Sequence, residues 1–364
     1  MDTTTLHARR PAPFRLAAIF VTLAALLAIT VAGASPAAAD TKVAVNIMLQ
    51  GHTNAALDLR NGEVSYYSNG WHKVTDTNPN NKSIARVNLD PGTYSFAVVY
   101  NGTRNQQQVT VDTDGQTVHF HSALVNMDLR DSKGQPLDGA ASYYAGGWHT
   151  IDGNTGVEML PGTYSFAAVY NGTRQQKSYT VLPRNPNNQA NQKQNVAFKT
   201  TLVTVQAQGS SPSPGSPQDI PANGSASYYA DGWHEITTLN PNNKRMVQAQ
   251  MLPGTYSFAL THNGTRHQQS QAVSETGPKT VYFQTASVKV SLTVNGEPVD
   301  AAEVTSSYYA NGWKDLPATG LQLLPGTYTF AVVHDGVRSQ QSYTVLPRNS
   351  NNNANGTQTV AFSR

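Results

Sequence analysis

The chain has 364 residues and no cysteine, which excludes disulfides, cysteine nucleophiles and thiolate metal sites. Charged residues make up 13% of it, and the formal net charge is +3. Residues 1–39 hold three arginines and one aspartate, and removing them from the 25 basic and 22 acidic residues leaves 22 and 21. A nearly neutral remainder argues against nucleic acid as a partner.

Residues 1–39 have the three parts of a secretory signal peptide. Arg9, Arg10 and Arg15 precede an apolar run over residues 16–31, and small residues end at Ala39. We expect cleavage before Asp40, which makes the product a secreted protein, free or associated with the cell surface. The alternative is an uncleaved anchor, since 16 apolar residues approach a short membrane span. We favour cleavage, after which no membrane contact is expected.

The rest of the chain repeats one hairpin four times. Each copy has a strand that begins with Pro-Gly-Thr-Tyr, a two-residue turn and a second strand; the turns are Asn101-Gly102, Asn171-Gly172, Asn263-Gly264 and Asp335-Gly336. Asn-Gly and Asp-Gly are the residues that a type I′ turn requires. The first three turns continue with threonine and are glycosylation sequons, whereas the fourth continues with Val337. We therefore attribute the pattern to backbone geometry.

The repeats predict four domains, at residues 40–123, 124–200, 201–286 and 287–364. The third contains a Pro/Ser/Gly-rich loop insertion at 209–221. Repeats one and three share an Asn-Pro-Asn-Asn-Lys insert, and repeats two and four share Leu-Pro-Arg-Asn, so a two-domain unit has been duplicated. The last strand of one repeat leads almost directly into the next repeat. Such short linkers predict a semi-rigid rod.

The second repeat shows the expected strands most clearly. They cover residues 124–131, 141–144, a short stretch around Trp148, 157–160, 163–170, 173–181 and 195–199. Helical periodicity is not convincing anywhere outside the leader. About seven short strands with frequent turns indicate an all-β fold of antiparallel, prealbumin-like or immunoglobulin-like sandwiches.

A family resemblance accompanies this pattern. Residues 131–140 read DSKGQPLDGA, and an aromatic strand and then Leu-Pro-Gly-Thr-Tyr-Ser-Phe follow. This order resembles the transthyretin-like domains of bacterial surface proteins, including carboxypeptidase-regulatory-like and collagen-adhesin B-type repeats, and covers all four units. The resemblance implies seven-stranded sandwiches used as stalks, spacers or adhesion domains. Some B-type repeats carry a Lys–Asn isopeptide cross-link, but no lysine recurs here at a matching strand position in all four repeats.

Each repeat also carries Tyr-Tyr followed by Gly-Trp. Strand alternation turns the first tyrosine inward and the second outward, close to the tryptophan. The candidate ligand-binding residues are Tyr67, Trp71, Tyr144, Trp148, Tyr229, Trp233, Tyr309 and Trp313. Exposed rings of this kind stack on the C–H face of a sugar. The alternative, which we favour for the tryptophans, is packing in the core or at a domain junction.

Other candidate sites are weaker. An Arg-x-Gln pair follows every hairpin turn and could bind a carboxylate or sugar hydroxyl, although we favour a solvated face. One histidine per repeat becomes Lys314 in the last copy, so we expect no metal site, and we expect no cofactor. Catalytic motifs and recurring acidic residues are missing from the sequence, so we expect no enzyme.

The leading hypothesis is a secreted, non-enzymatic repeat protein with an extracellular structural, spacer or adhesion role. The alternative is a multivalent carbohydrate-binding array that uses the Tyr-Tyr…Gly-Trp block of each repeat. The expected partner is accordingly an extracellular polysaccharide or a surface protein. The sequence does not specify the oligomeric state.

Overall fold

A computed structural model describes residues 42–152, 155–184, 192–209, 217–347 and 357–364. The expected signal peptide and its cleavage site lie outside these residues, as does most of the expected loop insertion. Within the described residues no helix has the length and apolarity that a membrane span requires.

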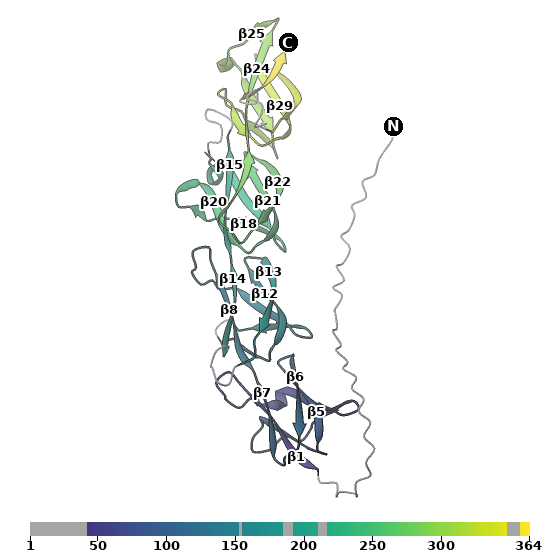
Figure 1. Cartoon of the computed structure of the whole chain (residues 1–364). Helices are drawn as coiled ribbons and strands as arrows, with labels where there is room; N and C mark the ends of the chain where they lie inside the picture. The colour runs from purple at the N-terminus through teal and green to yellow at the C-terminus, as the bar shows by residue number, and fades with distance from the viewer. Residues whose placement is uncertain (1–41, 153–154, 185–191, 210–216, 348–356) are drawn as a thin grey trace, which may run out of the picture. The chain divides into compact units, whose positions relative to one another are not determined.

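Short strands make up most of the described chain (Figure 1). The first repeat forms β1 (Val43–Gln50), β2 (Gly62–Tyr67), β3 (Trp71–Lys73), β4 (Ile84–Leu89), β5 (Gly92–Tyr100), β6 (Thr103–Val111) and β7 (Gln116–His121). The second forms β8 (Ala123–Arg130), β9 (Ala140–Tyr144), β10 (Trp148–Ile151), β11 (Val157–Met159), β12 (Gly162–Tyr170), β13 (Thr173–Val181) and β14 (Lys193–Lys199). The seven strands expected in the second repeat are therefore confirmed.

The third and fourth repeats add short elements to the same plan. The third forms β15 (Thr201–Gln208), β16 (Pro217–Gln218), β17 (Gly224–Tyr229), β18 (Trp233–Ile236), β19 (Leu239–Asn240), β20 (Asn243–Met251), β21 (Gly254–His262), β22 (Thr265–Val273) and β23 (Lys279–Gln284). The fourth forms β24 (Ala286–Val294), β25 (Glu297–Pro298), β26 (Thr305–Tyr309), β27 (Trp313–Asp315), β28 (Leu321–Leu323), β29 (Gly326–His334), β30 (Val337–Val345) and β31 (Thr357–Ser363). The helical pieces are η1 (Leu59–Asn61), α1 (Ile220–Asn223) and η2 (Ala301–Glu303).

Two sheets form each repeat. One is a four-stranded antiparallel sheet built on the repeated hairpin, in the order β3-β2-β5-β6, β10-β9-β12-β13, β18-β17-β21-β22 or β27-β26-β29-β30. The other contains the first and last strands of the repeat, as in β4-β1-β7 and β11-β8-β14. The all-β sandwich expected from the sequence is confirmed.

Each sandwich contains one parallel pair of strands besides the antiparallel pairs that the sequence predicts. The first and last strands of every repeat pair in parallel, β1 with β7, β8 with β14, β15 with β23 and β24 with β31. A parallel pair of this kind makes the chain leave a repeat in the direction in which it entered. Strand alternation cannot reveal the pairing, because both directions use the same period of two.

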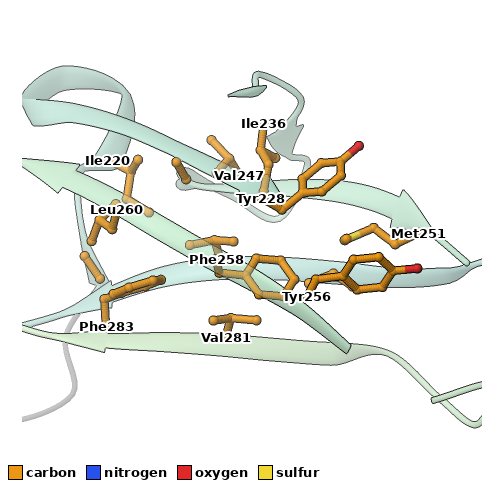
Figure 2. Packing of buried hydrophobic residues seen from close by; sticks show 14 of the residues in the cluster. Ile220, Tyr228, Ile236, Val247, Met251, Tyr256, Phe258, Leu260, Val281 and Phe283 are labelled. Carbon is orange, nitrogen blue, oxygen red and sulfur yellow. The ribbon is translucent and has the colours of Figure 1, made fainter. Parts of the chain in front are cut away.

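The core of each repeat lies between its two sheets. In the third repeat the inward side chains include Tyr256, Phe258 and Leu260 of β21, which alternate along that strand. Val281 and Phe283 of β23 pack against them from the other sheet (Figure 2). Burial of apolar surface on this scale is the main stabilising term in a protein without disulfides.

The hairpin turns adopt the backbone geometry that their sequence predicts. The first residue of each turn has φ between 47° and 50° and the glycine after it has φ between 71° and 84°. Two successive positive φ values are the signature of a type I′ turn. The four turns therefore confirm the prediction.

A single residue separates the last strand of one repeat from the first strand of the next. These residues are Ser122, Thr200 and Thr285, and all three are buried. Each backbone N–H donates to a carbonyl of the preceding repeat, and each hydroxyl donates to a side chain of the following one, Glu158, Gln250 or Gln322. The linker residue is thus held from both sides.

Candidate functional site

The strand register places the second tyrosine and the tryptophan of each repeat side by side. Tyr67 pairs with Trp71 across β2 and β3, and the other repeats have the same pairs: Tyr144 with Trp148, Tyr229 with Trp233, and Tyr309 with Trp313. Directly opposed residues of antiparallel strands point to the same face. The first tyrosine of each pair faces the core and the second faces outward, as expected; Tyr143, Tyr228 and Tyr308 are buried.

Both outward rings are well exposed to solvent. The tryptophans are 43–45% exposed and their tyrosine partners 49–52%. The ring centroids of each pair lie 5.6–5.7 Å apart, with an edge-to-face angle of 66–72°. The interpretation of the tryptophans as core residues is therefore wrong, because their pairing with the outward tyrosine places them on the solvent face.

An arginine completes the surface in every repeat. The guanidinium carbons of Arg104, Arg174, Arg266 and Arg338 lie 4.7, 4.8, 4.1 and 4.4 Å from the centroids of the tryptophan rings. In the first three repeats Nη1 of this arginine also donates to the glutamine two residues further on, at 3.0–3.4 Å. The Arg/Gln pairs are exposed, as expected for a solvated face, and they share that face with the aromatic rings. We call the tyrosine, tryptophan, arginine and glutamine of a repeat its outer cluster.

Small residues lie beneath the outer clusters. Ala97 has the outward parity of its strand and pairs with Ser65 on one side and Gln106 on the other. It is nevertheless only 1% exposed, and the matching Ala167, Ala259 and Ala331 are buried to the same degree. Larger outward side chains must cover these alanines. A small residue at this position thus leaves room for the larger side chains that cover it.

The outer clusters offer groups for recognition. An indole ring with a guanidinium over one face provides apolar contact, a fixed positive charge and directed N–H donors. The glutamine adds an amide, and the tyrosine adds a hydroxyl. These groups suit a sugar or a carboxylate-bearing polymer.

The recurring histidine has a structural contact in each repeat that carries it. Nε2 of His72, His149 and His234 lies 2.8–3.1 Å from a backbone carbonyl oxygen four residues earlier. The imidazole rings also stack on the inward tyrosines, with centroids 5.0–5.2 Å apart. Across the described ranges no three His, Cys, Asp or Glu residues are grouped in a way that could hold a metal ion.

A second repeated surface lies between consecutive repeats, and it was not anticipated from the sequence. The Asn-Gly-Thr turn of one repeat, which we call its tip, contacts the next repeat. There it meets three features that we call the socket: the inward tyrosine, the alanine two residues later, and the leucine before Pro-Gly. The sockets are formed by Tyr143, Ala145 and Leu160; Tyr228, Ala230 and Leu252; and Tyr308, Ala310 and Leu324.

Tyrosine hydroxyls hold the tips. Tyr143 Oη donates to the carbonyl of Asn101 at 2.8 Å, and Tyr228 and Tyr308 make the same bond to Asn171 and Asn263. Burial raises the pKa of Tyr228 and of Tyr308 to about 12. The phenols therefore stay protonated as donors over the physiological range.

The threonine and asparagine of a tip bond to the leucine segment of the socket. The N–H of Leu160 donates to Thr103 Oγ1 at 3.0 Å, and that of Leu252 donates to Thr173 Oγ1 at 3.1 Å. At the third junction Tyr328 Oη donates to Thr265 Oγ1. The side-chain amides of Asn101 and Asn263 donate to the carbonyls of Glu158 and Gln322.

The leucine of each socket is shared with the preceding repeat. Leu160, Leu252 and Leu324 are fully buried, and each belongs to the hydrophobic core of the repeat before its own. A Cβ on the tip glycine would lie 2.7–2.8 Å from the carbonyl of the socket alanine at all three junctions. Glycine is thus required both for its positive φ and for close approach.

Two substitutions in the sequence mark this surface. Threonine follows the tip glycine in the three tips that dock on another repeat, and valine follows it in the fourth tip. Leucine precedes Pro-Gly in the three sockets that receive a tip, and Asp90 does so in the first repeat. The sequon-like threonine is therefore explained by the junction, which refines the explanation by backbone geometry alone.

Comparisons with known proteins assign no family. No family model matches the chain, and no curated protein is similar to it. Among solved structures it is similar to the TIE protein of Bacillus anthracis, at 12% identity over 83% of this chain and 68% of that chain, with a TM-score of 0.21. It is also similar to BcpA, the major pilin subunit of Bacillus cereus, at 11% identity over 88% and 99% of the two chains (TM-score 0.21). A streptococcal ancillary pilin matches at 10% identity over 67% and 98%, with a TM-score of 0.19.

Proposed function

We propose that the protein is a non-enzymatic extracellular spacer or adhesion protein of bacteria, built from transthyretin-like sandwiches at residues 40–123, 124–200, 201–286 and 287–364. The junction between repeats is the observation that carries this proposal. It occurs three times with the same groups and a single linker residue. A protein whose task is to hold its ends at a set separation needs such junctions.

The energetics of the junction support a spacer. Removing a buried leucine side chain typically lowers stability by about 2–5 kcal/mol, and a buried hydrogen bond contributes about 1 kcal/mol. Each junction combines one fully buried leucine with several hydrogen bonds. Bending at a junction would break these contacts together, so we expect the repeats to keep their relative orientation.

Two glycine substitutions test this role. Gly172 and Gly336 have nearly the same φ, 72° and 74°, so alanine is strained equally at both. A Cβ at Gly172 would meet the Ala230 carbonyl, whereas one at Gly336 meets nothing within 4 Å. We expect Gly172→Ala to lower stability by about 1–3 kcal/mol more than Gly336→Ala, and to increase flexibility in small-angle X-ray scattering. Equal effects of the two substitutions would contradict a docked tip.

The second candidate is a multivalent carbohydrate-binding protein, and the exposure of the outer clusters favours it. Four sites on one chain would gain avidity from their spacing. A cavity of about 550 Å³ lies at the junction of the second and third repeats, lined by Tyr170 and Asn171 of the second repeat and by Trp233, Glu235 and Gln248 of the third, among others. Acidic or neutral polysaccharide is the ligand class that aromatic, guanidinium and amide groups fit.

Tryptophan substitution tests the second candidate. Because Trp148 is exposed, we expect Trp148→Ala to leave the fold intact and to weaken binding to a polysaccharide array. The matched control is Tyr282→Ala, since Tyr282 is 49% exposed and lies outside the outer clusters. Unchanged binding in Trp148→Ala, or equal loss in both variants, would contradict a role of the cluster in binding.

A further inference from the structure

The first and fourth repeats depart from the junction pattern on opposite sides. The fourth tip is Asp335-Gly336-Val337 in place of Asn-Gly-Thr. The first socket has Ser68 and Asp90 in place of the alanine and leucine. The described residues leave both surfaces without a partner repeat, and the substitutions fall on the groups that make the three internal contacts.

The fourth tip lacks the hydrogen-bonding groups of the other three. Valine has no hydroxyl, so it cannot accept the N–H that Thr103 and Thr173 accept. Aspartate replaces an amide donor by acceptors, where the amides of Asn101 and Asn263 donate to backbone carbonyls. Asp335 instead lies 3.3 Å from Nδ1 of the neighbouring His334, and Val337 is 52% exposed.

The first socket lacks the shared leucine. Asp90 stands where Leu160 of the second repeat enters the core before it, and Asp90 is exposed whereas Leu160 is fully buried. A carboxylate cannot occupy that apolar position without a large desolvation penalty. The inward Tyr66 is half-buried, while its three counterparts are buried. The first socket is therefore a polar, solvated face.

These two surfaces would meet if copies of the chain joined head to tail. The internal junction is heterologous, since a tip always contacts a different surface, and such interfaces generate open filaments when they repeat between molecules. At a junction between molecules, Asp335 would stand where Asn101 donates to the carbonyl of Glu158, and so would face the backbone carbonyl of Asn88. A carboxylate has no hydrogen to donate to that carbonyl, and the same junction would also contain the negative charge of Asp90, so both effects oppose docking.

We infer that the fourth tip and the first socket are end caps, which prevent a second copy of this chain from docking head to tail. The internal junctions hold repeats together, and four residues at the two ends keep the same interface from joining separate chains. The inference concerns the end faces alone and leaves the outer clusters free to bind a ligand.

Restoring the internal pattern at both ends tests the inference. The variant Ser68→Ala/Asp90→Leu/Asp335→Asn/Val337→Thr recreates a socket and a tip of the internal kind. In sedimentation experiments we expect its weight-average mass to rise with concentration, while the mass of the wild-type chain stays constant. A variant that is folded by circular dichroism and keeps a constant mass would overturn the inference, as would a wild-type chain that forms head-to-tail oligomers.

Two half-variants provide the control. The socket variant Ser68→Ala/Asp90→Leu and the tip variant Asp335→Asn/Val337→Thr each have only one restored face. We expect each to stay monomeric alone and the mixture to stop at a one-to-one dimer. Self-association of either half-variant, or a mixture that fails to form the dimer, would contradict docking of a tip in a socket.

Discussion

At the scale of single residues, position within the strand decides the role of each aromatic side chain. Adjacent tyrosines of one strand face opposite sides of the sheet. Tyr143 is buried and holds the preceding tip, whereas Tyr144 is half-exposed and lies against Trp148. The arginine of the outer cluster lies over the tryptophan ring. A cation–π contact at such an exposed site contributes about 0.5–1 kcal/mol.

His262 adds a pH dependence to the third repeat. It is 1% exposed, its Nδ1 has no hydrogen-bond partner in the described structure, and burial lowers its pKa to about 4, against a smaller opposing effect of Asp219. The unfolded chain, with a pKa near 6.5, therefore binds the proton first as the pH falls. Stability is fully present above about pH 6.5 and is lost as the pH falls toward 4.

We expect the free energy of unfolding of this repeat to fall by about 2 kcal/mol between pH 7 and pH 5. His262→Tyr is the matched variant, since Tyr100 and Tyr170 occupy the equivalent positions of the first two repeats. Its unfolding midpoint should vary less between the two pH values. A wild-type midpoint that is the same at pH 7 and pH 5 contradicts the assignment.

At the scale of elements, the hairpin of the four-stranded sheet is the part that reaches beyond its own repeat. Strands β12 and β13 are paired over their full length, from Gly162 opposite Val181 to Tyr170 opposite Thr173. The turn between them is therefore rigidly supported. A supported turn can present its polar groups to the next repeat with little loss of entropy on docking.

Thr173→Val tests the contribution of one tip hydroxyl. It leaves the buried N–H of Leu252 without its acceptor, and we expect a loss of about 1–3 kcal/mol in thermal or denaturant unfolding. The control is Thr180→Val, which removes a hydroxyl from the same strand in an exposed cross-strand pair with Thr163 and should change stability by less than about 0.5 kcal/mol. Equal losses would show that the junction bond contributes nothing specific.

At the scale of the whole molecule, the sequence predicts local features well and contacts between repeats poorly. The type I′ turns, the alternation of the two tyrosines and the strands of the second repeat all follow from residue patterns. The parallel pairing of β8 with β14 does not, because neighbours in a sheet are not encoded in strand periodicity. The prediction that the tryptophans are buried rests on their size and is wrong, because register with Tyr144 and its equivalents places them on the outer face.

The sequence of a single repeat does not predict the contacts between repeats, for a related reason. The N–H of Leu252 and the hydroxyl of Thr173 are far apart in the sequence, and nothing local distinguishes this threonine from a glycosylation site. Only the comparison of the four copies, in which Val337 and Asp90 break the pattern at opposite ends, contains the signal. The positions at which one repeat differs from the others therefore indicate which residues form the interfaces.

The shared leucine has a consequence for how such a chain can change in length. Leu160, Leu252 and Leu324 each complete the hydrophobic core of the preceding repeat. Two kinds of repeat alternate along the chain, and the junction uses an equivalent leucine whichever kind comes first. A repeat between the first and the fourth can therefore be gained or lost by recombination, because the new junction would use the same contacts as the existing ones. The length of the array can therefore change by whole repeats, while the first socket and the fourth tip stay unchanged.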